Sequence, residues 1–271
     1  MRNINEEFIK ALLSGELSFF LSQVKANRDT LSLEIRNGYI NIYYKGGNLL
    51  KIMQKAKGYS FYFDVKYCKH ANQTGNETII RSLSHNNLQD YITNFDNLKK
   101  EMDCWFADHP KEERDYQHNL LVNNSCIVDI EYQVARRMRL DMLVVADHKL
   151  VIVENKYGNG AITGNASVSK HYADMCEVLE TPELYKELID SVCSISKCKK
   201  ALGLTEKSYD ETYFTSAEIL FLFANYNADS KRINNEVKLL TKSIEAKRLM
   251  TAKNEYILDL TQAKDLFAYE D

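Results

Sequence analysis

The stretch RLDMLVVADHKLVIVENK, residues 139–156, joins two apolar runs through the short polar step Asp147-His148. Two such runs around a two-residue step are typical of an antiparallel β-hairpin. Both faces of each run are apolar, and strands of this kind lie in the interior of a sheet. The stretch therefore predicts the central hairpin of a larger sheet.

The hairpin register places three charged residues together. If Ala146 faces Lys149, the residue numbers of every facing pair in the hairpin add up to the same total. Asp141 then lies opposite Glu154. Opposed residues have Cβ atoms about 4.5–5.5 Å apart. Lys156 follows Glu154 by two residues and projects from the same face. The spacing predicts two carboxylates and one amine side by side.

Two opposed carboxylates need a physical reason, because like charges directly opposite each other destabilise a sheet. Partly buried carboxylate pairs either share a proton or hold a cation. Oxygen ligands select hard metals, so Mg²⁺ is the expected cofactor, with Mn²⁺ as a substitute. The alternative is an edge hairpin whose three charges are solvated, and the apolar flanking runs argue against an edge.

Asp141, followed after a hairpin by Glu154-Asn155-Lys156, resembles the signature of the PD-(D/E)XK nuclease superfamily. The resemblance covers about residues 110–225, where the predicted order of elements is helix, three strands, helix and strand. Leu140 stands where the family name places proline, a position that varies in the family. The resemblance implies an α/β protein with a restriction-endonuclease-like mixed central sheet flanked by helices.

The resemblance also implies roles for these residues. Asp141 and Glu154 would bind the metal with the backbone carbonyl of Asn155, and Lys156 would position the attacking water and offset developing negative charge. The chain is then expected to be a Mg-dependent hydrolase that cleaves phosphodiester bonds, with DNA favoured over RNA. The alternative is a catalytically silent nucleic-acid-binding or protein-interaction module that retains the nuclease fold.

An auxiliary acid is expected at Glu113, on a helix predicted over residues 111–122. The resemblance supports an acidic residue on this helix, and Glu131 on the first strand is its competitor. The alternative is that Glu113 has no catalytic role, because a glutamate in the first turn of a helix interacts favourably with the helix dipole in any case.

Basic residues near the hairpin are candidates for contacts with nucleic acid. They are Arg136, Arg137, Arg139 and Lys170. A further basic stretch, Lys231–Lys253, is either a phosphate-binding helix or a solvated helix face, with helix expected over residues 232–250. A closing strand is expected over residues 255–260.

Residues 31–66 form runs of β-favouring residues separated by glycines, including the tight-turn signal Asn37-Gly38. They predict a four-stranded antiparallel β-meander, with a helix over residues 3–24 before it. The polar stretch 70–77 is the best candidate linker. We therefore expect two domains: an N-terminal helix plus β-meander domain at residues 1–75 and a nuclease-like domain at residues 76–271.

Composition limits the class of protein. A net charge of −3 over 271 residues argues against a protein that coats nucleic acid by bulk charge, and it leaves room for an enzyme with a local basic groove. The six cysteines lack a C-x-x-C pair, which favours reduced thiols over a zinc site or a disulfide framework. No apolar run approaches the roughly 20 residues of a membrane span, and no signal-peptide core is visible. We expect a cytoplasmic protein, which could form a homodimer.

Overall fold

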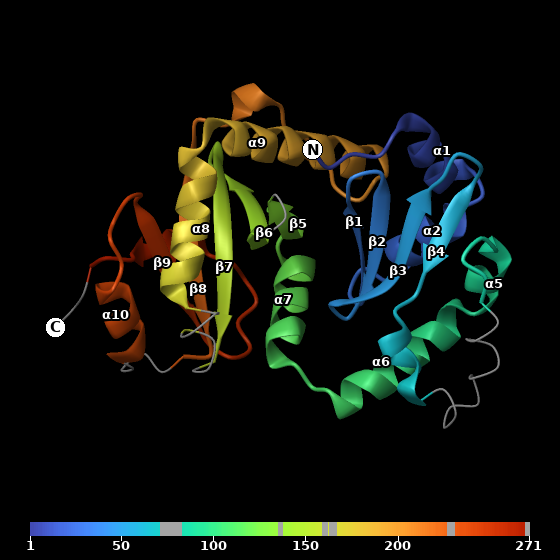
Figure 1. Cartoon of the computed structure of the whole chain (residues 1–271), viewed down its shortest axis with the longest axis horizontal. Coiled ribbons are helices and arrows are strands. Elements are labelled where there is room, and N and C mark those ends of the chain that lie inside the picture. The colour runs from blue at the N-terminus through green and yellow to red at the C-terminus, as the bar shows by residue number, and fades with distance from the viewer. Residues whose placement is uncertain (71–82, 135–137, 159–161, 163–166, 227–230, 269–271) are drawn as a thin grey trace. The chain divides into compact units, whose positions relative to one another are not determined.

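A computed structural model describes residues 1–70, 83–134, 138–158, 162, 167–226 and 231–268. It has an α/β fold with a four-stranded antiparallel sheet and a six-stranded mixed sheet, both flanked by helices (Figure 1). The expected α/β class and the N-terminal meander are confirmed.

Contacts divide the chain into two compact units. The meander unit comprises Arg2–His118 and Lys197–Lys207, and the mixed-sheet unit comprises Met1, Asn119–Ser196 and Ser208–Asp271. Residues 83–118 thus group with the meander, although the predicted domain boundary lies after residue 75. The predicted boundary after residue 75 separates parts that are expected to fold independently, and it stays a prediction.

Two helices, α1 (Glu6–Ser14) and α2 (Ser18–Ala26), replace the single helix expected over residues 3–24. Gly15 ends α1, because its backbone is extended (φ −101°, ψ −155°) although its N–H still donates to the carbonyls of Ala11 and Lys10. The break lets both short helices bury an apolar face, with Phe8 and Phe20 fully buried.

The meander consists of four consecutive strands in the order β1-β2-β3-β4. Their bounds are β1 Leu31–Ile35, β2 Tyr39–Tyr44, β3 Gly47–Gln54 and β4 Tyr59–Tyr62. Alternate residues such as Ile40, Ile52 and Phe61 are buried on one face. The ring of Phe61 lies 6.0 Å from that of Phe20, so α2 covers this face.

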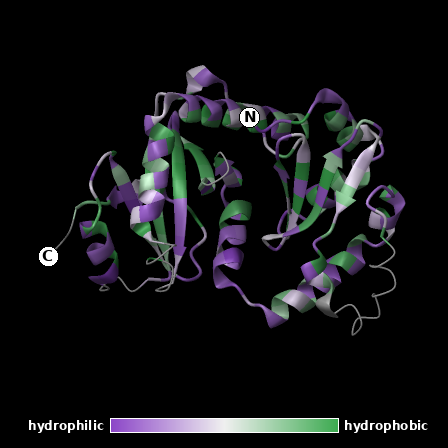
Figure 2. Cartoon of the chain, in the orientation of Figure 1, coloured by the Kyte–Doolittle hydropathy of each residue, from purple (hydrophilic) through white to green (hydrophobic). Residues whose placement is uncertain are grey.

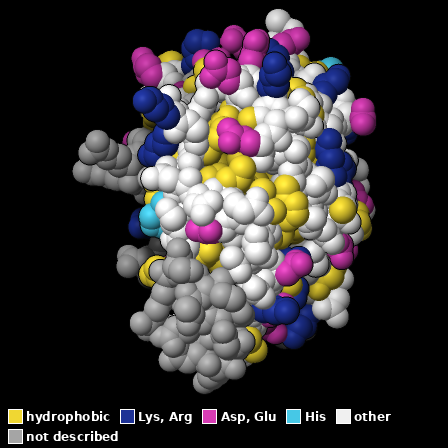
Figure 3. Space-filling model, turned by 90° about the vertical axis from the view of Figure 1, so that its right-hand side faces the viewer, with side chains coloured by type: hydrophobic (Ala, Val, Ile, Leu, Met, Phe, Trp, Pro, Cys, Tyr) yellow, Lys and Arg dark blue, Asp and Glu magenta, His cyan; other side chains and the backbone are white. Residues whose placement is uncertain are grey.

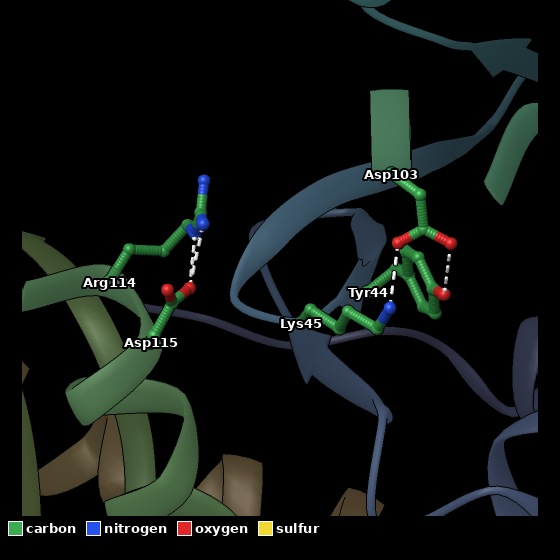
Figure 4. Close-up of polar contacts among 5 residues, drawn as sticks. All are labelled: Tyr44, Lys45, Asp103, Arg114 and Asp115. Carbon is green, nitrogen blue, oxygen red and sulfur yellow. Dashed lines mark hydrogen bonds and ion pairs between the residues drawn. The ribbon is translucent and has the colours of Figure 1, made fainter. Parts of the chain in front are cut away.

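Helices η1 (Val65–His70), α5 (Leu88–Thr93), α6 (Phe95–Asp108) and α7 (Glu112–Asn123) follow the meander. The side chain of Asp103 in α6 binds two residues at the end of β2. Its Oδ2 accepts a hydrogen bond from the Tyr44 hydroxyl at 3.0 Å, and its Oδ1 lies 2.7 Å from Lys45 Nζ (Figure 4). The β2–β3 turn is thereby held against the helices.

Gly46 in this turn has φ +75°, a conformation that L side chains rarely adopt. A Cβ atom here would lie 2.8 Å from Arg114 Cγ and 2.9 Å from the Arg114 carbonyl oxygen. The close approach of turn and α7 thus requires glycine.

We expect Gly46→Ala to lower the free energy of unfolding more than Gly58→Ala does. Gly58 has nearly the same φ, +74°, but open space around it. Gly58→Ala should cost about 1–2 kcal/mol for left-handed strain alone. Gly46→Ala should cost about 1–3 kcal/mol more, because the added methyl overpacks the contact with Arg114. Equal costs in urea denaturation would contradict the close packing.

The mixed sheet has the order β10-β9-β8-β7-β6-β5. Its strands are β5 Ile127–Val134, β6 Met138–Ala146, β7 Lys149–Tyr157, β8 Ser216–Ala224, β9 Ala246–Thr251 and β10 Lys264–Asp265. β5, β6 and β7 are antiparallel neighbours, whereas β7, β8 and β9 run parallel. The expected central hairpin is therefore confirmed in the sheet interior.

Helices α8 (Val168–Glu180) and α9 (Pro182–Ala201) contact opposite faces of this sheet. His171 of α8 contacts Glu154, whereas Ser191 of α9 accepts a hydrogen bond from the Tyr132 hydroxyl at 2.9 Å. Tyr132 pairs with Leu140, which places it on the face opposite to that of Glu154. Short helices η3 (Glu211–Tyr213), α10 (Lys231–Lys238) and η4 (Leu260–Gln262) complete the described elements.

The expected helix over residues 232–250 and strand over residues 255–260 are wrong. α10 ends at Lys238, residues 246–251 form β9, and 255–260 is irregular up to η4. Tyr172 of α8 redirects the chain, since its hydroxyl accepts N–H groups from Ser243 and Ile244 and donates to the Ile244 carbonyl. The segment then pairs with β8, so tertiary contacts override local helix propensity.

The surface is mixed in charge. Figure 3 shows acidic and basic side chains interspersed on the face in view, with hydrophobic side chains between them. Among the described helices, none is both long and apolar enough to cross a bilayer.

Candidate active site

The register of β6 and β7 brings the predicted acids together. Met142 pairs with Val153, the pair farthest from the turn among the observed pairs of β6 and β7. Asp141 and Glu154 are the next residues outward, and Asp141 Oδ2 accepts a hydrogen bond from the Asn155 N–H at 3.0 Å. The two carboxylates therefore stand on neighbouring strands, as the spacing predicts.

Glu154 is the centre of a buried cluster. Its Oε1 lies 2.8 Å from Lys156 Nζ and 3.0 Å from His171 Nδ1. Glu154 and Lys156 are 3% and 2% exposed, and the His171 side chain retains 24% exposure. Both contacts fall on one carboxylate oxygen, which fixes the orientation of the carboxylate.

The cluster is buried because β7 lies between β6 and β8 in the sheet. Glu154 pairs with Phe221 and Lys156 pairs with Phe223, so aromatic side chains of β8 flank the charges. Figure 2 shows β7 changing from hydrophobic to hydrophilic towards its C-terminal end. Removing one partner of a buried ion pair typically costs about 3–5 kcal/mol. These charges are thus costly to place here, which is typical of functional sites.

Asn155 can contribute through its backbone only. Its side chain points to the other face of the sheet, where Nδ2 and Oδ1 are buried and have no hydrogen-bond partner among the residues that the structure describes. In a strand, the N–H and C=O of one residue point the same way. Since the N–H bonds Asp141, the Asn155 carbonyl also points towards Asp141.

Strand β5 adds acids on the same face. Asp129 pairs with Leu143, and by the same register Glu131 lies opposite Asp141. Asp129 is fully buried, and the sequence prediction missed it, although its two-residue spacing from Glu131 was the available signal. Glu131 has φ +49°, a backbone conformation that L side chains rarely adopt and that indicates local strain of the kind found at functional sites.

The other predicted residues are placed differently. Glu113 is exposed in the first turn of α7 and belongs to the meander unit, and its role as auxiliary acid stays a prediction. Arg136 and Arg137 lie outside the described residues. The Arg139 side chain is 63% exposed and lies 3.9 Å from Glu131 Oε1, and Lys170 is exposed in α8. Their contacts with nucleic acid stay predictions.

Basic residues of the 231–253 stretch make contacts within the protein. Lys247 lies 2.9 Å from Glu218 Oε2, and Lys149 bonds the other oxygen of that carboxylate. Burial raises the pKa of Glu218, but the hydrogen bonds from the two lysines outweigh it and hold the pKa below its usual value. Arg248 bonds Asn234 and the Ala268 carbonyl. Lys247 and Arg248 thus stabilise the sheet.

The donor set suits a hard cation. Two carboxylates, Asp141 and Glu154, stand beside the Asn155 carbonyl, and Mg²⁺ typically takes one or two carboxylates and completes its shell with water and phosphate. Among the residues that the structure describes, no group of three or more His, Cys, Asp and Glu side chains is arranged to hold a metal. A site for Mg²⁺ or Mn²⁺ here would therefore rely on two side chains and a backbone oxygen.

Comparison with known proteins gives no match: neither a protein-family model, nor a curated protein, nor a solved structure is similar to the chain.

We expect His171→Ala to lower the free energy of unfolding by about 1–3 kcal/mol, the range for a hydrogen bond to a buried charged group. His171→Gln should recover more than half of the loss, because its amide can also donate to Glu154. Lys170→Ala is the matched control, since the neighbouring exposed side chain should change stability by less than about 0.5 kcal/mol. An unaltered stability of His171→Ala would show that Lys156 alone holds the carboxylate.

Proposed function

We propose that the protein is a metal-dependent nuclease that hydrolyses phosphodiester bonds, with DNA as the substrate class that the superfamily resemblance favours. The observation that carries the proposal is the juxtaposition of half-buried Asp141 with buried Glu154 and Lys156 on one face of β6 and β7. The order α7, β5–β7, α8 and the parallel strand β8 supports a restriction-endonuclease-like arrangement of the mixed sheet.

In this proposal, Asp141, Glu154 and the Asn155 carbonyl hold a divalent cation. A bound Mg²⁺ or Mn²⁺ would polarise the phosphodiester and lower the pKa of nearby water. His171 and Lys156 keep Glu154 in one orientation through Oε1. The carboxylate is thus already fixed when substrate arrives, which reduces the reorganisation that the reaction requires.

Lys156 has a second role beside holding Glu154, which is to stabilise negative charge on the phosphate during hydrolysis. Hydrolysis joins a water oxygen to phosphorus, breaks the bond from phosphorus to the ester oxygen, and leaves that oxygen protonated. An ammonium carries three N–H donors, so it can hold Glu154 and a phosphate oxygen at the same time. Its low exposure strengthens its interaction with the negative charge that builds up on the phosphate.

The test is incubation of the protein with plasmid, single-stranded DNA and RNA in Mg²⁺, Mn²⁺ or EDTA. We expect cleavage with one or both ions and none in EDTA. Asp141→Asn should reduce the rate at least about 100-fold, since it removes a charge that holds the cation. This variant is suitable because its side-chain oxygen can still accept the Asn155 N–H, so its melting temperature should remain close to wild type.

Equal cleavage by wild type and Asp141→Asn, or cleavage that persists in EDTA, contradicts the proposed site. A folded protein that binds nucleic acid but cuts none of the three substrates with either ion supports the silent binding module instead. Lys156→Ala is less suitable as the first variant, because it leaves the buried Glu154 without its ammonium.

The auxiliary acid is tested by comparing Glu131→Gln with Glu113→Gln across a Mg²⁺ titration of cleavage. The register favours Glu131, which lies opposite Asp141, and we expect its variant to raise the half-maximal Mg²⁺ concentration about 10–100-fold. Glu113→Gln is the control and should follow the wild-type curve. A shift with Glu113→Gln alone would restore the role that the sequence assigns to it.

A further inference from the structure

The four-stranded sheet has a second face, which we call the outer face. Its residues alternate with the buried apolar ones, and cross-strand pairing places Tyr39 beside Met53, Asn41 beside Lys51, and Lys51 beside Tyr62. Tyr62 is 36% exposed, and Tyr39, Lys51 and Met53 are half-buried. The accessible part of the outer face is therefore aromatic and basic, and it is limited to these residues, because Glu34, Asn41 and Tyr43 of the same face are buried.

Aromatic rings and a lysine form a row on the outer face. Lys51 Nζ lies 4.1 Å from the ring centroid of Tyr39 and 5.9 Å from that of Tyr62. The Tyr62 ring in turn stacks on His85, with centroids 4.8 Å apart and an interplanar angle of 28°. The row thus combines flat π-surfaces with one positive charge between them.

The accessible charge of the outer face is positive within the described part of the chain. Lys55 extends back to Met53, with Nζ 3.1 Å from Sδ. Glu34, the acid of this face, is 1% exposed and paired with Lys199 at 2.7 Å. The surface therefore complements an anion that also carries planar groups.

We propose that the outer face binds single-stranded nucleic acid, with bases stacked on Tyr39 and Tyr62 and backbone phosphate beside Lys51. Aromatic side chains bind unpaired bases of any sequence, and lysines follow the backbone. A duplex keeps its bases stacked on each other and so offers them no access to these rings. The choice of nucleic acid as partner rests on the proposed nuclease function, whereas the surface itself belongs to the other unit.

The test measures binding of a fluorescent twelve-nucleotide oligothymidylate by anisotropy in EDTA, so that cleavage does not interfere. The double variant Tyr39→Leu/Tyr62→Leu should raise the Kd at least about tenfold, since each stacked base contributes substantially. Lys51→Gln should reduce the slope of log K against log salt by about 0.7, the value for one phosphate contact on a single strand. The same oligonucleotide in a duplex should bind at least tenfold more weakly.

The matched control is Tyr213→Leu. Tyr213 also stacks on a histidine, His148, at 4.4 Å and 28°, but it lies in the mixed-sheet unit. It should bind the oligonucleotide like wild type. Lys51→Gln changes one half-buried surface side chain, so it gives a folded variant if the double variant loses structure in circular dichroism.

Wild-type affinity in both the double variant and Lys51→Gln overturns the inference, as does no binding up to about 100 µM protein, the weak end of non-specific affinity. A change in oligomeric state by light scattering, with unchanged affinity, assigns the face to a second copy of the chain and also overturns it. Cleavage in Mg²⁺ is scored separately. If the variants lose binding but the wild type cleaves nothing, the nuclease proposal is rejected and the binding surface stands. If the wild type cleaves but the variants bind as tightly as it does, the binding surface alone is rejected.

Discussion

The turn at Asp147 and His148 constrains the rest of the mixed sheet. Both residues have positive φ, 47° and 61°, the combination that a tight two-residue hairpin requires. This turn fixes which residues of β6 and β7 lie opposite each other. A slip of one residue would send Asp141 and Glu154 to opposite faces, because side chains alternate along a strand. The candidate site exists only in the register that this turn sets.

The register also creates an electrostatic problem that the surrounding structure has to solve. Glu154 lies between apolar strands, where an uncompensated carboxylate would be strongly destabilising. Lys156 supplies the compensating charge from the same strand, and His171 supplies a second contact from α8. The same contacts that offset the cost of burial also hold the carboxylate still. Stability and the proposed chemistry therefore depend on the same atoms.

The sequence predicted what depends on local spacing. The hairpin follows from periodicity and a short turn and is confirmed. The pairs as far as Met142 with Val153 keep the register that the opposition of Asp141 and Glu154 requires. What failed depends on contacts distant in sequence: β9 forms because β8 offers a parallel partner, and Tyr172 holds the chain that leads into it. The contact of His171 with Glu154 likewise requires α8 to pack on the sheet, which no spacing rule predicts.

The pairing of lysines with acidic side chains within the protein limits the positive charge that is available to attract a polyanion. Its net charge is −3, and lysines such as Lys149 and Lys247 are already engaged by Glu218. Long-range attraction is therefore weak. In the proposed function, affinity would come from short-range contacts: a cation held by carboxylates in one unit and stacking on tyrosines in the other. Stacking contributes affinity that does not come from counterion release, whereas each phosphate contact by a lysine such as Lys51 adds to the salt dependence of binding. Recognition of unpaired bases by stacking would give selectivity for single strands with few basic side chains at the surface, which is consistent with the slightly acidic composition of the chain.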